Sequence, residues 1–156
     1  MEILKEKSCA ISIRRAVPND LRWIIPELRT FSNFYGTKKN LFEENQETID
    51  SLLGVITDHV FIIAEKNGEG IGFICGLINP HIYNRSFKIL TELFWWVNEQ
   101  NRNSKAGLML LKEFINTGKE NADWITFGLM ETTPVKEKSI LKYGFKKMET
   151  NFLMEV

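Results

Sequence analysis

The sequence has few of the residues that form disulfide frameworks or zinc sites. Its two cysteines, Cys9 and Cys75, lie in apolar, strand-like surroundings and have no CxxC spacing. We therefore expect two buried thiols in a reducing compartment rather than a disulfide. Its two histidines, His59 and His81, have no histidine or cysteine neighbour at helical spacing, so no metal site is expected.

Net charge and long apolar runs are also missing. The 20 basic residues balance the 20 acidic ones, which argues against general binding to nucleic acid or to a membrane surface. No apolar run approaches the length that spans a bilayer, and the start MEILKEKSCA mixes charges with apolar residues, unlike a signal peptide. The sequence therefore predicts a cytoplasmic protein. Residues 1–156 contain no repeat or flexible linker and are expected to form a single domain.

Hydrophobic periodicity predicts secondary structure in the order β-α-α-β-β-β-α-β-α-β. The strands are expected over residues 10–14, 59–64, 71–78, 88–97, 124–130 and 145–154. The helices are expected after Pro18-Asn19-Asp20, over residues 43–58, from Ala106 to about Gly118, and from Thr132-Thr133-Pro134 to about Tyr143. Asn19 or Asp20 can cap the first helix, and Pro26 should shorten or kink it. Asn67-Gly68 predicts a hairpin turn, because this pair tolerates positive φ.

This order predicts an α+β (α/β) fold around a mixed, mainly antiparallel central sheet. The strands over residues 59–64, 71–78 and 88–97 follow one another through turns, which is typical of an antiparallel meander. The strand over residues 88–97 then leads through a helix into the strand over residues 124–130. A crossover of this kind makes the two strands parallel neighbours.

The polar segment RNSKAG after the aromatic strand has the composition of an anion site. The start of a helix offers unpaired N–H groups and a partial positive charge, and small residues let a phosphate come close. Ser104 can cap the helix or donate its hydroxyl, and Ala106 and Gly107 are small. Arg102 and Lys105 add positive charge. Basic residues before a helix are often only solvated, so composition alone leaves both interpretations open.

Together with the elements around it, this segment resembles the GNAT superfamily of N-acetyltransferases. In that family a strand leads into an (Arg/Gln)-x-x-Gly-x-(Gly/Ala) loop whose amides hold the pyrophosphate of acetyl-CoA. Arg102 and Gly107 fit the first and last positions, whereas Lys105 replaces the first glycine. Lys105 therefore either binds through its amide, with its side chain turned outward, or weakens the site. The resemblance also includes Leu110-Leu111 and Tyr143-Gly144-Phe145.

The resemblance implies helices on both faces of the sheet and a V-shaped slot where the strand over residues 88–97 diverges from its parallel neighbour. The pantetheine arm of acetyl-CoA would lie in that slot. The N–H groups that would hold the thioester and polarise its carbonyl are those of Phe94, Trp95, Trp96 and Val97. The pyrophosphate would lie against Arg102, Asn103, Ser104, Lys105, Ala106, Gly107 and Leu108. Trp95 and Trp96 alternate faces, so either one of them lines the slot or both pack in the core.

The reaction that the resemblance implies is direct acetyl transfer to an amine, which needs a general base. Glu92 is the best candidate, because it precedes the thioester-binding stretch on the central strand, and Glu131 is a weaker one. The family often uses a tyrosine as general acid at the position of Ile140. Tyr143 is the nearest phenol in the sequence, although water could also protonate the thiolate.

The expected protein is an acetyl-CoA-dependent N-acetyltransferase that acts, as a monomer or homodimer, on a primary amine of a small molecule or peptide. The alternative is a catalytically weak or inactive acyl-CoA-binding module that acts as a sensor or interaction protein. Lys105 and Ile140 favour this alternative. Acceptor choice would come from the loop over residues 81–86 and from the first helical region, whose aromatic residues form either a substrate wall or core: Phe31, Phe34, Tyr35 and Phe42.

Overall fold

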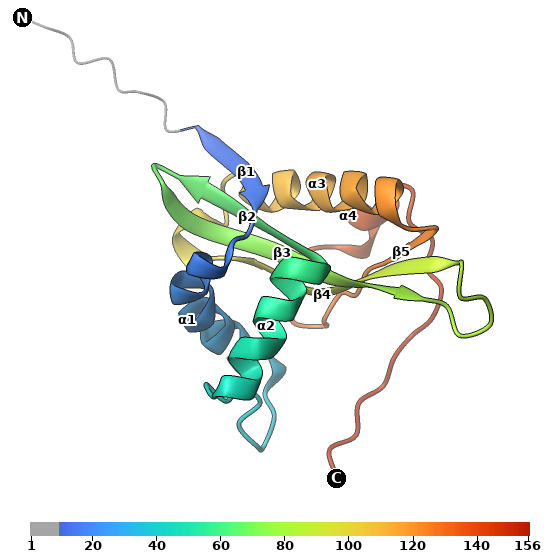
Figure 1. Cartoon of the computed structure of the whole chain (residues 1–156), viewed down its shortest axis with the longest axis horizontal. Coiled ribbons are helices and arrows are strands. Elements are labelled where there is room, and N and C mark those ends of the chain that lie inside the picture. Colours follow the sequence, from blue (N-terminus) through green and yellow to red (C-terminus); the bar gives the residue numbers. More distant parts are fainter. Residues whose placement is uncertain (1–9) are drawn as a thin grey trace, which may run out of the picture.

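A five-stranded sheet forms the centre of the computed structural model, which describes residues 10–156 (Figure 1). Its strands lie side by side in chain order: β1 (Ile11–Arg15), β2 (Val60–Lys66), β3 (Glu69–Pro80), β4 (Lys88–Val97) and β5 (Trp124–Thr126). The first four strands pair antiparallel, and β5 pairs parallel with β4. The mixed, mainly antiparallel sheet is therefore confirmed. Cys75 on β3 is a buried free thiol, as predicted, whereas Cys9 lies outside the described residues.

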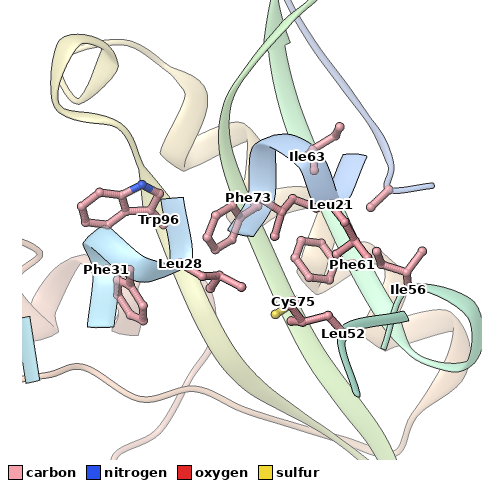
Figure 2. Packing of buried hydrophobic residues seen from close by; sticks show 12 residues of the cluster. Leu21, Leu28, Phe31, Leu52, Ile56, Phe61, Ile63, Phe73, Cys75 and Trp96 are labelled. Carbon is pink, nitrogen blue, oxygen red and sulfur yellow. The ribbon is translucent and has the colours of Figure 1, made fainter. Parts of the chain in front are cut away.

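Helices cover both faces of this sheet (Figure 1). They are α1 (Leu21–Ser32), α2 (Gln46–Asp58), α3 (Ala106–Asn121) and the short α4 (Glu137–Leu141). Alternate residues of β2 point to opposite faces: Phe61 and Ile63 pack with α1 and α2, whereas Ile62 and Ala64 pack with α3. The sheet therefore has a separate hydrophobic core on each side, and Figure 2 shows the one under α1 and α2. No helix within residues 10–156 is long and apolar enough to cross a membrane.

The first helix starts where the sequence predicted but is longer than a short helix. Asp20 occupies the N-cap position of α1 without a side-chain capping hydrogen bond; its carboxylate instead accepts hydrogen bonds from the Val17 N–H and from Arg14. The helix continues through Pro26 for 12 residues, so it is not short. Pro26 is exposed, and α1 continues past it without the hydrogen bond that a backbone N–H at this position would donate to the carbonyl four residues earlier.

The third helix is longer than predicted because Gly118 does not end it. A Cβ at Gly118 would lie 2.5 Å from the side chain of Ile125 and 3.1 Å from that of Leu90. The glycine thus lets α3 lie close against the sheet, and the helix runs on to Asn121. The turn at Asn67-Gly68 is as predicted, with φ of 55° and 78°.

The C-terminal part of the chain has less regular structure than predicted. β5 ends at Thr126 rather than Met130, the expected helix from Thr132 shrinks to α4, and the predicted strand over residues 145–154 does not form. The side chains of Phe152, Leu153 and Met154 are largely exposed. The prediction failed because an apolar, strand-like sequence forms a strand only where a neighbouring strand pairs with it.

Candidate active site

The parallel strands β4 and β5 part soon after they meet. They pair only at Ile89–Trp124, Leu90–Ile125 and Thr91–Thr126, although β4 continues to Val97. Beyond Thr91, the β5-facing edge of β4 therefore has no neighbouring strand within residues 10–156. Unpaired strand amides along such an edge can donate hydrogen bonds to a ligand. The divergence that the sequence resemblance implied is present.

A β-bulge lies in β4 where the two strands part. Gly76 of β3 pairs with Glu92 and Cys75 pairs with Phe94, so Leu93 is an extra residue in β4. Leu93 and Phe94 consequently both pack towards α1 and α2, whereas Trp95 packs towards α3. Bulges of this kind re-aim side chains and are common beside active sites.

The opening beside the bulge is a cavity of about 370 Å³, which we name the β4 slot. Residues from several segments line it: Phe31, Phe34 and Tyr35 near the end of α1; Glu92, Leu93, Trp95, Trp96 and Val97 on β4; Arg102 and Gly107 near the start of α3; and Gly128, Leu129, Met130, Thr132, Thr133, Pro134 and Val135 after β5. The predicted site residues Glu92, Trp95, Trp96, Val97, Arg102 and Gly107 thus meet in one place.

Glu92 is the ionisable group whose environment in the slot is most unusual. Burial raises the pKa of its carboxyl group from 4.5 to about 7, although the hydrogen bond from the Gly128 N–H acts in the opposite direction. A carboxyl group with this pKa is about half ionised at neutral pH and can accept a proton there. Glu131, the weaker candidate, is exposed and lies outside the lining of the slot.

Trp96 and Arg102 together form one wall of the slot. Trp96 is buried against α1, and its indole Nε1–H donates to Glu27 Oε2 at 2.6 Å. The Arg102 guanidinium carbon lies 4.7 Å from the centre of a Trp96 ring, and its Nε–H donates to the Val97 carbonyl at 3.2 Å. Trp96 is therefore both core and slot wall, while Arg102 is held at the end of β4 by stacking and a backbone contact.

The start of α3 has the geometry of an anion site. The Ser104 hydroxyl donates to the Asn101 carbonyl and accepts from the Ala106 N–H at 3.2 Å, so Ser104 binds the first N–H of the helix, while Lys105 occupies the N-cap position. Within residues 10–156, no group accepts a hydrogen bond from the N–H groups of Asn103, Lys105, Gly107 and Leu108. Those amides remain available to a ligand.

The lysine in place of the first motif glycine fits the local backbone. Lys105 has φ of −78° and ψ of −1°, a right-handed helical conformation, and its side chain is exposed. No glycine is needed there for conformational reasons. At Gly107, a Cβ would lie 3.6 Å from Trp95 and from Val97, which is an ordinary contact, so alanine would also fit.

The phenol that lines the slot is Tyr35 rather than Tyr143. Tyr143 is in the turn after α4, exposed and outside the lining of the slot, and Ile140 is buried under α3. Burial, and then the charge on Glu92, raise the pKa of Tyr35. The sequence offered Tyr35 only as an aromatic wall or core residue, because nothing in its local pattern indicates proximity to Glu92. Gly128 was missed for the same reason, since its contribution is a backbone N–H.

The chain matches no protein-family model and no curated protein sequence, but its fold is shared by many solved structures. A predicted acetyltransferase with acetyl-CoA from Clostridium acetobutylicum has a TM-score of 0.73 at 16% identity, covering 94% of this chain and 96% of that one. A transcriptional regulator from Bacillus halodurans C-125 has a TM-score of 0.76 at 17% identity, with 94% and 100% covered. These similarities, together with the divergence of β4 from β5, identify the architecture. The chain has the GNAT fold.

An aminoglycoside acetyltransferase from an uncultured soil metagenomic sample, crystallised with trehalose, also has this fold, with a TM-score of 0.69 at 14% identity and 94% and 96% of the two chains covered. Within the GNAT fold of this chain, the slot and the start of α3 contain the functional groups described above. No set of three His, Cys, Asp or Glu side chains among residues 10–156 is placed to hold a metal ion.

Proposed function

We propose that the protein is an acetyl-CoA-dependent N-acetyltransferase that moves the acetyl group directly to a primary amine of a small molecule or peptide. The observation that carries this proposal is a carboxyl group with a pKa near 7, that of Glu92, in the slot between the diverging strands. The acetyltransferases among the similar structures, one of them with acetyl-CoA, support it.

The residues around the slot fit acetyl-CoA as a co-substrate. In our proposal the free amides at the start of α3, from Asn103 to Leu108, hold the pyrophosphate, with Ser104 and Ala106 shaping the turn. Arg102 adds positive charge beside it. Backbone groups alternate sides along β4, and Asn98 just after it donates to Ile71 on the β3 side, so the N–H groups of Trp95 and Val97 face the open edge and those of Phe94 and Trp96 face β3. In our proposal the N–H groups of Trp95 and Val97 stabilise the negative charge that develops on the thioester carbonyl.

Glu92 is assigned as the general base. A lysine-type amine has a reference pKa of about 10.4 and is mostly protonated at neutral pH, so its proton must leave before or during attack. Glu92 takes this proton, the amine nitrogen bonds to the acetyl carbon, and the carbon–sulfur bond breaks to release a thiolate. We assign protonation of the thiolate to Tyr35 or to solvent, because Tyr143 lies outside the slot.

Two measurements test the proposal. Release of free thiol from acetyl-CoA is followed across a panel of primary amines, and the binding of CoA is measured by isothermal titration calorimetry. We expect saturable CoA binding and amine-dependent thiol release with at least one acceptor. Absence of any CoA binding would overturn both the enzyme and the CoA site.

A non-catalytic acyl-CoA-binding module is the second candidate. Two observations favour it: a buried isoleucine, Ile140, at the position where the family often has a tyrosine, and the absence of Tyr143 from the slot lining. CoA binding without thiol release from any amine would support this candidate. Mass spectrometry of the amines after incubation then distinguishes slow transfer from none.

A further inference from the structure

A second, larger cavity adjoins the β4 slot on the side of α1 and α2. Its volume is about 1020 Å³, and we name it the α2 cavity. Phe31, Tyr35 and Leu93 line both cavities, so the two spaces meet beside the β-bulge. These three side chains therefore lie between the α2 cavity and the slot that contains Glu92.

Much of the α2 cavity is apolar. In addition to the three shared residues, Leu41, Phe42, Leu77 and Phe94 contribute side chains to its wall. A cavity of this size and composition suits the body of a drug-sized molecule and gains free energy mainly by removing apolar surface from water. The wall also contains hydroxyl and amide side chains that can hydrogen-bond to polar groups of a ligand: Ser32, Asn40, Asn45, Thr48 and Ser51.

All charged side chains that line the α2 cavity are carboxylates. They belong to Glu43, Glu47 and Asp58, all three exposed at the cavity mouth, and neither lysine nor arginine among residues 10–156 belongs to the lining. The nearby Arg29 is paired with Glu44 and faces the Phe42 ring at 6.0 Å from the ring centre. The cavity thus repels an anionic ligand and favours a neutral or cationic one.

We propose that the acceptor is a primary amine on an apolar or aromatic body that carries no negative charge. The body lies in the α2 cavity, and the amine passes Tyr35 and Leu93 to reach Glu92. This inference rests on the proposed acetyltransferase activity and adds the substrate class to it.

Three matched amines test the charge requirement. They are 2-phenylethylamine and its ring derivatives with a 4-carboxamide or a 4-carboxylate, which share the amine and the ring and differ in charge at the far end. We expect kcat/KM for the carboxylate to be about tenfold below that for the carboxamide, because its charge is repelled by the three carboxylates of the lining. Ethanolamine, which has no apolar body, is expected to be a poorer acceptor than 2-phenylethylamine.

Two variants test whether the preference for the carboxamide over the carboxylate arises in the α2 cavity. The double variant Glu47→Gln/Asp58→Asn should bring the two ring derivatives to within about threefold of each other, whereas Glu113→Gln, an exposed change on α3, should leave the ratio unchanged. Equal kcat/KM values for the three amines with the wild-type protein, or a preference for ethanolamine, would overturn the inference and leave the proposed activity standing.

Direct binding separates the two proposals. Isothermal titration of the same amines, without acetyl-CoA, should show the same order of affinity. If this order is present but no amine releases thiol, the substrate class stands as a binding preference and the catalytic proposal fails. If thiol is released without any difference among the amines, only the substrate class fails.

Discussion

The backbone N–H of Gly128 donates a hydrogen bond of 3.3 Å to Glu92 Oε2 across the gap between β4 and the segment after β5. This contact joins the two sides of the slot at the point where strand pairing has ended. It favours the ionised carboxylate, but burial has the larger effect and raises the pKa of Glu92 to about 7. Glu92 is thus held in the slot in a form that can gain or lose a proton at neutral pH.

The first prediction concerns the pH dependence of acetyl transfer. In the wild-type enzyme, kcat/KM should rise between pH 6 and pH 8 with a pKa near 7, because only ionised Glu92 accepts the proton of the amine. Glu92→Gln should lower kcat/KM by about 100-fold or more and abolish this limb of the profile. Glu131→Gln, at an exposed position outside the slot, is the control. A profile unchanged by Glu92→Gln would remove Glu92 from the chemistry.

Glu92 should also make stability depend on pH. Its pKa is about 7 in the folded chain against a reference of 4.5, so the folded state holds this proton more tightly than the unfolded state. The stabilisation by the protonated group is complete below pH 4.5 and is lost as the pH rises through 7. Relative to Glu92→Gln, the free energy of unfolding of the wild type should fall by up to about 3 kcal/mol across this range. Urea denaturation of both proteins at several pH values measures this difference, and a constant difference would contradict the buried environment.

Gly107 tests the assignment of the start of α3 to the pyrophosphate. Gly107→Glu would place bulk and negative charge in the lining of the slot and should weaken CoA binding at least about tenfold. A glutamate in the first turn of a helix is compatible with the helix dipole, so the fold should persist, as circular dichroism can check. Gly107→Ala should bind CoA normally, because its Cβ meets only ordinary contacts. Unchanged affinity in Gly107→Glu would show that the pyrophosphate lies elsewhere.

The two candidate phenols can be separated by matched substitutions. Tyr35→Phe should lower kcat more than Tyr143→Phe, because Tyr35 lines the slot and Tyr143 does not. Each change removes only a hydroxyl group from a partly exposed side chain, so comparable melting temperatures are the check on folding. A larger loss of kcat in Tyr143→Phe would restore Tyr143 as the general acid. Equal and undiminished turnover in both variants would leave protonation of the thiolate to solvent.

The sequence was most informative where a local pattern directly sets a local structure. Asn67-Gly68 predicted its turn because positive φ favours these residues. The order of elements predicted the parallel neighbour of β4 because a helical crossover requires it. The predictions were wrong at Gly118, where packing against Ile125 overrides the usual preference of glycine for helix ends, and over residues 145–154, where apolar side chains do not produce a strand.

By itself, the sequence determined the mixed sheet and the placement of Glu92, Trp96 and Arg102 near one helix start, because periodicity and short-range spacing act along the chain. The helices on both faces were implied by the family resemblance and are present. Only the tertiary structure decided that Tyr35 lines the slot, that Gly128 holds Glu92, and that a second cavity, whose charged lining is acidic, adjoins the slot. These relationships join segments far apart in the sequence. Their chemistry depends on burial and distance, which exist only once the two faces of the sheet have been covered.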